Sequence, residues 1–127
     1  MTAPRPRIAV VGASSDRSKY GNKAVRAFVA QGWEVFPVHP TLAEVEGLPA
    51  YPDLASIPVD RLDRVSLYVP PEVGLGVLDQ VREKRVDELW VNPGAESPEL
   101  LERAEALGLV PVLACSILDV GEDPHRL

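Results

Sequence analysis

The stretch Ile8-Ala9-Val10-Val11-Gly12-Ala13-Ser14-Ser15 decides the fold. Four apolar residues in a row are typical of a strand that is buried on both faces of a parallel sheet. Gly12 provides the tight turn that must follow such a strand. Residues 20–31 then have apolar side chains at helical spacing, and Gly32 stands where a C-terminal cap is expected. The sequence therefore begins with a strand, a turn and a helix.

The alternation of apolar strands and helical patterns continues along the chain. We expect further strands at 34–38, 65–69, 89–91 and 110–113, and helices at 72–85 and from Ser97 to residue 107. Residues 41–58 are rich in proline and glycine and predict loops with one or two short helical turns. The pattern predicts the α/β class, with a doubly wound parallel sheet in three layers. We expect a single domain over 1–127, with its ordered core at about 7–119.

Composition restricts the class of partner. The chain has 127 residues and a net charge of −6, which disfavours nucleic acid. No apolar run approaches the roughly 18 residues of a membrane span, and the first seven residues do not resemble a signal peptide. Cys115 is the only cysteine, so an internal disulfide is excluded and a reducing compartment is expected. We expect a soluble cytoplasmic protein with no nucleic acid or membrane partner.

Ligands of such sheets bind beyond the carboxyl ends of the strands. After the first strand, small side chains and two hydroxyls precede a helix amino terminus, as in turns that hold a phosphate group. The dinucleotide fingerprint is incomplete there, because Ser14 replaces its second glycine and Arg17 its third. A tight turn with no ligand is the alternative. The four strand ends contain Gly12, Ala13, Ser14 and Ser15; Val38, His39 and Pro40; Val69, Pro70 and Pro71; and Asn92, Pro93 and Gly94.

The end of the second strand distinguishes between nucleotide ligands. Nicotinamide enzymes usually carry an acidic residue there to bind the ribose hydroxyls, but Glu34 lies at the start of that strand. A ligand with a phosphate on its adenosine ribose would avoid an acid at this place. Arg17, Lys19 and His39 are the basic candidates to meet such a phosphate.

Several segments together resemble a known family. They are VGASSDRSKYG, GWEVFPVHP, LPAYPDLASIP, SLYVPPEVGLGVLDQV, LWVNPGAESPEL and ALGLVPVLACSILD, and they span about residues 7–119. This order and spacing is similar to that of the CoA-binding domain proteins, small Rossmann-like domains related to the amino-terminal domain of the succinyl-CoA synthetase alpha subunit. In this chain His39-Pro40 is followed by Thr41, where family members often have a lysine or an arginine.

The resemblance implies that coenzyme A lies across the carboxyl edge. Gly12, Ala13, Ser14 and Ser15 would meet the pyrophosphate, flanked by Arg17, Lys19 or Tyr20. Val38, His39 and Pro40 would border the adenosine; Val69, Pro70 and Pro71 would line the pocket; and Asn92, Pro93 and Gly94 would approach the pantetheine arm. A Gly12→Val change would then push a side chain into the space of the pyrophosphate. On this view the chain binds CoA or acyl-CoA without catalysing a reaction, as a carrier, sensor or regulator.

Other residues have two interpretations. Cys115 stands where the family places a cysteine, and would either form a mixed disulfide with CoA or pack as a small core residue. His125 is expected in a frayed tail. Trp33 and Trp90 are expected to pack in or beside the core, and Asp87-Glu88 to lie on solvated helix ends without a chemical role. No spacing typical of metal ligands or of a Ser/His/Asp triad occurs.

Three alternatives to a stand-alone binding protein remain open. The chain could be a nicotinamide-dependent oxidoreductase, which would exchange hydride with its cofactor. It could be the detached subunit of an acyl-CoA synthetase, which would co-purify with a larger ATP-grasp chain. It could also be an empty scaffold for oligomerisation. The partners compatible with the resemblance are a small-molecule ligand, further copies in a homo-oligomer, or an acyl-CoA synthetase-like chain.

Overall fold

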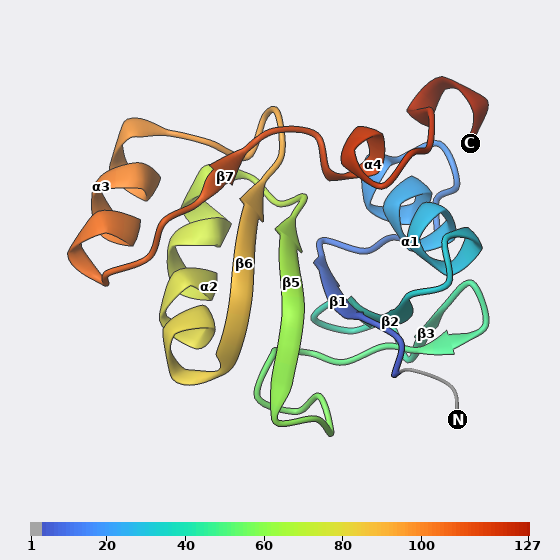
Figure 1. Ribbon diagram of the computed structural model, residues 1–127, viewed down its shortest axis with the longest axis horizontal. Helices are drawn as coiled ribbons and strands as arrows, with labels where there is room; N and C mark the ends of the chain where they lie inside the picture. Colours follow the sequence, from blue (N-terminus) through green and yellow to red (C-terminus); the bar gives the residue numbers. More distant parts are fainter. Residues whose placement is uncertain (1–3) are drawn as a thin grey trace.

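The computed structural model describes residues 4–127 (Figure 1). In chain order the elements are β1 (Arg7–Val11), α1 (Tyr20–Ala30), β2 (Glu34–Val38), β3 (Glu44–Val45), β4 (Leu48–Pro49), β5 (Arg61–Leu67), α2 (Pro71–Glu83), β6 (Arg85–Val91), α3 (Pro98–Ala106), β7 (Val112–Leu113), α4 (Ser116–Asp119) and the 3₁₀ turn η1 (Pro124–Arg126).

The central sheet has the order β2-β1-β5-β6-β7, and all of its pairings are parallel. From β1 the chain moves to β2 on one side, and later to β5 on the other side. The strand order therefore reverses between β1 and β5, which is where doubly wound sheets bind ligands. The arrowheads of β5 and β6 point to the top of Figure 1, which marks the carboxyl edge. The predicted α/β fold with a doubly wound parallel sheet is confirmed.

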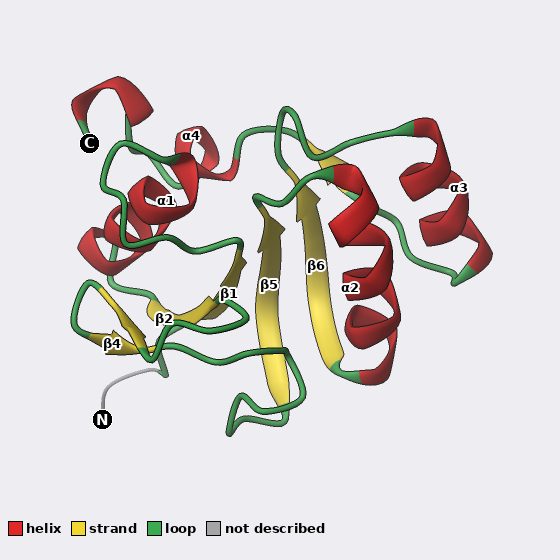
Figure 2. Cartoon of the chain, turned by 180° about the vertical axis from the view of Figure 1, so that it is seen from behind, coloured by secondary structure: helices red, strands yellow, loops and turns green. Residues whose placement is uncertain are grey.

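Alternate residues of the strands pack into two hydrophobic clusters. Ile8 and Val10 of β1 pack with Phe28 and other residues of α1, whereas Ala9 and Val11 belong to the cluster that contains apolar residues of α2 and α3. Figures 1 and 2 show α1 beside α4, and α2 beside α3, at separate places along the sheet. The helices thus cover both faces of the sheet and give the three expected layers. Trp90 is buried and the ring of Trp33 lies edge-on to Phe28, so both tryptophans pack as predicted.

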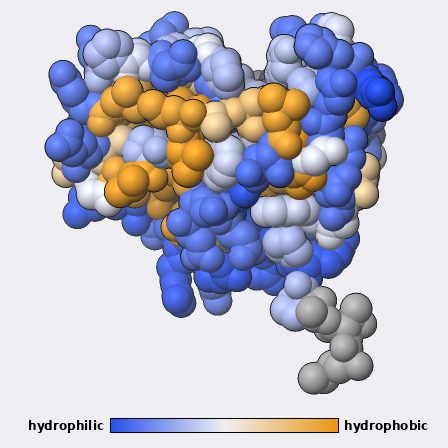
Figure 3. Space-filling model, turned by 45° about the horizontal axis from the view of Figure 1, so that its top comes forward, coloured by the Kyte–Doolittle hydropathy of each residue, from blue (hydrophilic) through white to orange (hydrophobic). Residues whose placement is uncertain are grey.

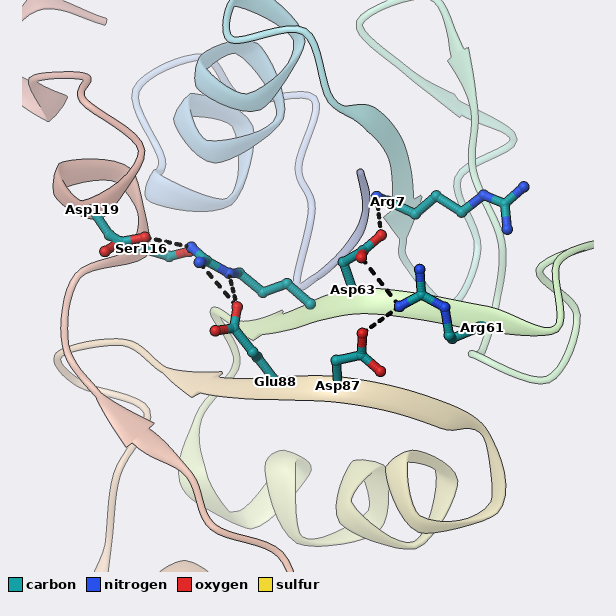
Figure 4. Close-up of polar contacts among 8 residues, drawn as sticks. Arg7, Arg61, Asp63, Asp87, Glu88, Ser116 and Asp119 are labelled. Atoms are coloured by element: carbon teal, nitrogen blue, oxygen red, sulfur yellow. Dashed lines mark hydrogen bonds and ion pairs between the residues drawn. The ribbon is translucent and has the colours of Figure 1, made fainter. Parts of the chain in front are cut away.

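Charged residues begin both central strands, which is why these strands are longer than predicted. β5 begins at Arg61 instead of residue 65, and β6 at Arg85 instead of residue 89. Arg61 pairs with Asp63 and, across the two strands, with Asp87 (Figure 4). These ion pairs replace the apolar pattern that marks a buried strand. The expectation that Asp87-Glu88 lies on a helix end is wrong, because both residues belong to β6.

The segment 41–58 contains a β-hairpin instead of the expected helical turns. β3 and β4 pair antiparallel around a tight turn, in which Glu46 and Gly47 have positive φ angles of 50° and 78°. Two successive residues in this conformation are typical of the primed turns of hairpins. Glu46 is an unusual residue for this conformation, so the turn has only a weak signal in the sequence. Its carboxylate accepts hydrogen bonds from Arg17 and Asn22, which join the hairpin to the loop after β1 and to α1.

The remaining boundaries are close to the expected ones. α1, α2 and α3 lie within two residues of the predicted helices. β5 ends at Leu67, so Val69 belongs to the loop that follows, and β7 contains only Val112 and Leu113. Regular structure continues beyond residue 119 to η1. No helix in residues 4–127 is long and apolar enough to cross a membrane.

Candidate functional site

A pocket of about 710 Å³ opens at the carboxyl edge of the sheet, next to the point where the strand order reverses. Figure 3 turns this edge toward the viewer and shows apolar surface gathered across it. The lining comes from the loop after β1, the start of α1, the loops after β5 and β6, and the carboxyl-terminal segment. It consists of Gly12, Lys19, Tyr20, Gly21, Tyr68, Val69, Pro70, Pro71, Glu72, Asn92, Pro93, Gly94, Ala95, Cys115, Leu118, Pro124 and His125.

Many of the predicted site residues meet in this pocket. Those in its lining are Gly12, Lys19, Tyr20, Val69, Pro70, Pro71, Asn92, Pro93 and Gly94. Those outside the lining are Ala13, Ser14, Ser15, Arg17, Val38, His39 and Pro40. The structure therefore brings three of the four predicted strand ends together and leaves the end of β2 to one side.

The loop after β1 is fixed by hydrogen bonds within the protein. The N–H groups of Gly12 and Ala13 both donate to the carbonyl oxygen of Val38, at 3.2 Å. Ser14 Oγ accepts a hydrogen bond from the N–H of Asp16 at 3.0 Å. The hydrogen bonds from Ser18 to the Asp16 carboxylate lower the pKa of Asp16. In the first turn of α1 the N–H of Asn22 donates to the carbonyl oxygen of Lys19 at 3.1 Å. Within residues 4–127, the N–H groups of Ser14, Ser15, Tyr20 and Gly21 donate to no protein acceptor, so these groups can meet a phosphate.

Two glycines allow this loop to pack closely. Gly12 has a φ of 91°, and a Cβ atom there would lie 2.6 Å from the carbonyl oxygen of Tyr68. A Cβ atom on Gly21 would lie 2.0 Å from the carbonyl oxygen of Gly12. The substitution Gly12→Val would therefore collide with the backbone after β5, and it tests the fold before it tests a ligand. Gly21 was not among the predicted site residues, and it allows α1 to begin against the loop.

The basic residues near α1 differ in their surroundings. Lys19 is the N-cap residue of α1 and lines the pocket. Arg17 lies outside the lining, where its Nη1 donates to Glu46 Oε1 at 2.7 Å. Since that carboxylate already offsets the guanidinium charge, Lys19 is the better placed of the two to meet an anion in the pocket.

The end of β2 serves its own loop. His39 Nδ1 accepts hydrogen bonds from the N–H groups of Thr41 and Leu42, at 3.1 and 3.0 Å. Because Nδ1 is an acceptor, the proton of the neutral ring lies on Nε2. Val38 is buried in the core and its carbonyl oxygen holds the loop after β1. These residues shape the turn from β2 toward β3.

Asn92, at the end of β6, is a buried joint between the strand ends. Its Nδ2 donates to Ser66 Oγ at 2.7 Å and to the carbonyl oxygen of Leu67 at 2.9 Å, and its Oδ1 accepts from the N–H of Ser116 at 2.8 Å. Asn92 is 3% exposed. Its side chain therefore supports the pocket wall, and the following residues Pro93 and Gly94 present the surface that a ligand would meet.

Tyr68 has a buried hydroxyl group that was not expected from the sequence. The residue lines the pocket, but its hydroxyl oxygen is inaccessible and has no hydrogen-bond partner among residues 4–127. Burial raises the pKa of Tyr68 well above its ordinary value, and the nearby Ser66 side chain acts in the opposite direction without forming a hydrogen bond of normal geometry. The sequence feature that could have identified Tyr68 as a site residue is its place in the segment SLYVPP, directly after an apolar strand.

The carboxyl-terminal segment forms another wall. Cys115 and Leu118 line the pocket, as do Pro124 and His125 of η1. Lys23 Nζ on α1 donates to the carbonyl oxygen of Pro124 at 2.9 Å, and Asp123 caps η1 through the N–H of His125. The prediction that His125 lies in a frayed tail is wrong, because these contacts fix the segment against α1. No local pattern in the sequence indicated this long-range packing.

The distribution of charge divides the pocket into two ends. Among the lining residues, Lys19 and His125 are basic and lie with the start of α1 and η1, whereas the loops after β5 and β6 contribute mainly apolar side chains and Glu72. No group of three His, Cys, Asp or Glu side chains in the described part of the chain is placed to hold a metal ion. The arrangement suits a ligand with an anionic part and a long, less polar part.

The fold and the pocket define a Rossmann-type ligand-binding domain. The model of the family described as CoA binding domain matches residues 6–120, and the chain belongs to this family. It is 27% identical over 107 residues to the uncharacterised protein YneT of Bacillus subtilis, covering 84% of this chain and 78% of that protein. A conserved hypothetical protein of Pyrococcus furiosus has a similar structure, with 37% identity, a TM-score of 0.82, and coverage of 90% of this chain and 98% of that chain.

Larger enzymes contain a similar domain. The chain is 27% identical over 112 residues to an ADP-forming acetate–CoA ligase of Archaeoglobus fulgidus, covering 80% of this chain and 16% of the ligase. The dinucleotide-forming acetyl-coenzyme A synthetase 1 of Ca. Korarchaeum cryptofilum has a TM-score of 0.68 and 32% identity, covering 84% of this chain and 25% of the synthetase. The chain therefore corresponds to a small part of these enzymes, and is related to their CoA-binding region.

Proposed function

We propose that this protein binds coenzyme A or an acyl-CoA in the pocket at the carboxyl edge. The observation that carries the proposal is that Lys19 at the start of α1, the loops after β5 and β6, and the carboxyl-terminal segment line one pocket. A volume of about 710 Å³ is within the usual range for small-molecule sites. Membership of the CoA binding domain family supports this choice of ligand.

The two ends of the pocket suggest an orientation for the ligand. The pyrophosphate would lie at the amino terminus of α1, where the N–H groups of Tyr20 and Gly21 and the side chain of Lys19 favour negative charge. The pantetheine arm would run past Val69 and Pro93 toward Cys115. In this orientation the seven predicted residues outside the lining, Ala13, Ser14, Ser15, Arg17, Val38, His39 and Pro40, would border the adenosine side or support the loop.

We propose that the chain has no reaction of its own and acts as a carrier, sensor or regulator of CoA. A second role is favoured by the similarity to the acetate–CoA ligase and to the acetyl-CoA synthetase: the chain would be a detached subunit of such an enzyme. Both roles use the same pocket. Co-purification with a larger ATP-grasp chain distinguishes the second role, and hydride exchange with a nicotinamide cofactor would indicate an oxidoreductase instead.

The site is tested by removing one positive charge from it. Lys19→Ala is expected to weaken CoA binding about tenfold or more, since a hydrogen bond to a charged group contributes about 1.5–3 kcal/mol. Arg82→Ala is a matched control, because Arg82 is an exposed basic residue in the last turn of α2, outside the pocket lining. Isothermal titration calorimetry with CoA measures both affinities. Equal affinities of the two variants for CoA would place the pyrophosphate elsewhere.

A further inference from the structure

Arg64 is a buried arginine in the middle of β5 and takes no direct part in the pocket lining. It is 6% exposed, and its guanidinium carbon lies 4.1 Å from the ring centroid of Trp90 and 5.2 Å from that of Trp33. A charge in such surroundings must be paired, because burial without partners is costly. The identity of its partners therefore indicates what the residue holds in place.

The partners of Arg64 come from two different elements. Its Nη2 lies 3.0 Å from Glu88 Oε1 on β6, the neighbouring strand of the same sheet. Its Nη1 lies 3.0 Å from Asp119 Oδ2 and 3.2 Å from Ser116 Oγ, both on α4. In Figure 4 the side chains of Ser116, Asp119 and Glu88 lie around one unlabelled guanidinium group, and these contacts identify it as that of Arg64. Arg64 thus joins α4 to the sheet.

α4 depends on such external contacts for its position. A helix of four residues is too short to be stable by itself. Besides Arg64, the Asn92 side chain accepts a hydrogen bond from the N–H of Ser116. Cys115 directly precedes α4 and Leu118 lies within it, and both residues line the pocket. The contacts that hold α4 therefore also fix this part of the pocket wall.

We propose that Arg64 is a positioning residue, which fixes the wall formed by Cys115 and Leu118 through its ion pair with Asp119. The pair with Glu88 joins two strands that are already paired, so it stabilises the sheet without acting on the wall. The ion pair with Asp119 keeps α4 closed over the sheet and limits access to Cys115. The proposal deepens the proposed function. Its expected effect on CoA binding rests on that function, but its expected effect on access to Cys115 does not.

The two carboxylates provide a matched pair of variants. Asp119 and Glu88 have side chains that are 44% and 47% exposed, and each contacts Arg64 at 3.0 Å. Asp119→Asn and Glu88→Gln each remove one negative charge and keep the shape of the side chain. Similar losses of stability are expected from both, and urea denaturation checks that both variants fold.

The first measurement is the rate at which 4,4′-dithiodipyridine modifies Cys115, the only cysteine of the chain. Asp119→Asn is expected to raise this rate at least fivefold above that of the wild-type protein. Glu88→Gln is expected to leave the rate within twofold of the wild-type value. Asp119→Glu, which keeps the charge, is expected to restore slow modification. Equal acceleration by Asp119→Asn and Glu88→Gln, or no acceleration by Asp119→Asn, would overturn the proposal.

The second measurement is the affinity for CoA of the same variants. Asp119→Asn is expected to weaken CoA binding several-fold and Glu88→Gln to leave it within twofold. If the wild-type protein does not bind CoA, the proposed function is refuted. The thiol measurement would still decide the role of Arg64. If CoA binds the wild-type protein and both variants equally well, the wall formed by Cys115 and Leu118 does not contribute to the site. The role of Arg64 in positioning that wall for the ligand is then refuted.

Discussion

Asn92 Oδ1 accepts a hydrogen bond from the N–H of Ser116 at 2.8 Å, and this contact joins the end of β6 to the start of α4. The same side chain donates two hydrogen bonds toward β5. Asn92 therefore connects three segments that are distant in sequence and that line or support one pocket. A residue predicted to meet the ligand acts here as a part of the framework around it.

Asn92→Ala is expected to lower the free energy of unfolding by about 2–3 kcal/mol. The change leaves buried partners on Ser66 and Ser116 without their hydrogen bonds, and each unsatisfied buried group costs about 1–3 kcal/mol. Urea denaturation monitored by tryptophan fluorescence measures the difference. A variant as stable as the unmodified protein would contradict the role of Asn92 as a buried joint.

Gly12→Ala is expected to destabilise the protein by more than about 2 kcal/mol, because the new Cβ atom would lie 2.6 Å from the Tyr68 carbonyl oxygen and Gly12 has a positive φ angle. Gly76→Ala is the control, since Gly76 is an exposed residue of α2 with open space around it. Alanine there is expected to stabilise the helix by about 0.5–1 kcal/mol. Thermal unfolding measures whether each variant is less or more stable than the wild-type protein. A Gly12→Ala variant as stable as the wild-type protein would show that the loop can move away from Tyr68.

Tyr68→Phe is expected to raise the free energy of unfolding at pH 7 by about 1 kcal/mol, because it removes a buried hydroxyl group without a partner. The two proteins should also differ in alkaline solution. Since burial raises the pKa of Tyr68 in the folded state, the unfolded chain loses this proton first as the pH rises above the ordinary value of 10.0. The unmodified protein should then lose about 1.4 kcal/mol more per pH unit than Tyr68→Phe. Parallel pH profiles of stability would contradict this burial.

Dephospho-CoA is expected to bind nearly as well as CoA, within about threefold. The 3′-phosphate distinguishes these ligands, and the basic residues nearest to its expected place are poorly disposed to meet it. Arg17 is paired with Glu46, and Nδ1 of His39 accepts hydrogen bonds from its own loop. Thr41 stands where family members often have a lysine or an arginine. Competition calorimetry compares the ligands, with Arg17→Ala as a control that should not change their ratio. A preference for CoA of tenfold or more would show that a cation reaches the 3′-phosphate.

Local patterns predicted the fold well where a strand is apolar along its whole length. Residues 8–11 and the helix after them lie where the sequence indicated, because burial on both faces requires an unbroken apolar run. The prediction failed where ion pairs replace that run, as between Arg61 of β5 and Asp87 of β6, and where a hairpin turns at Glu46-Gly47. In those segments long-range partners, and not neighbouring residues, determine the conformation.

For the candidate site, the sequence predicted the strand ends but could not predict which of their groups are already bonded. His39 was expected to face a ligand, yet its ring accepts hydrogen bonds from its own loop. His125 was expected in a frayed tail, yet η1 packs against α1 and brings it to the pocket. The position of His125 depends on packing between segments about 100 residues apart, which leaves no periodic signal in a single sequence. The bonding of His39 depends on the conformation of its own loop.

The most direct test of the account is a calorimetric titration of the unmodified protein with CoA, with NAD and ATP titrated in parallel. We expect saturable 1:1 binding of CoA, weaker binding of NAD and ATP, and a thermal stabilisation of about 2.7 kcal/mol when CoA is present at 100 times its dissociation constant. No heat and no stabilisation with CoA, or tighter binding of NAD, would contradict the assignment of the pocket to coenzyme A.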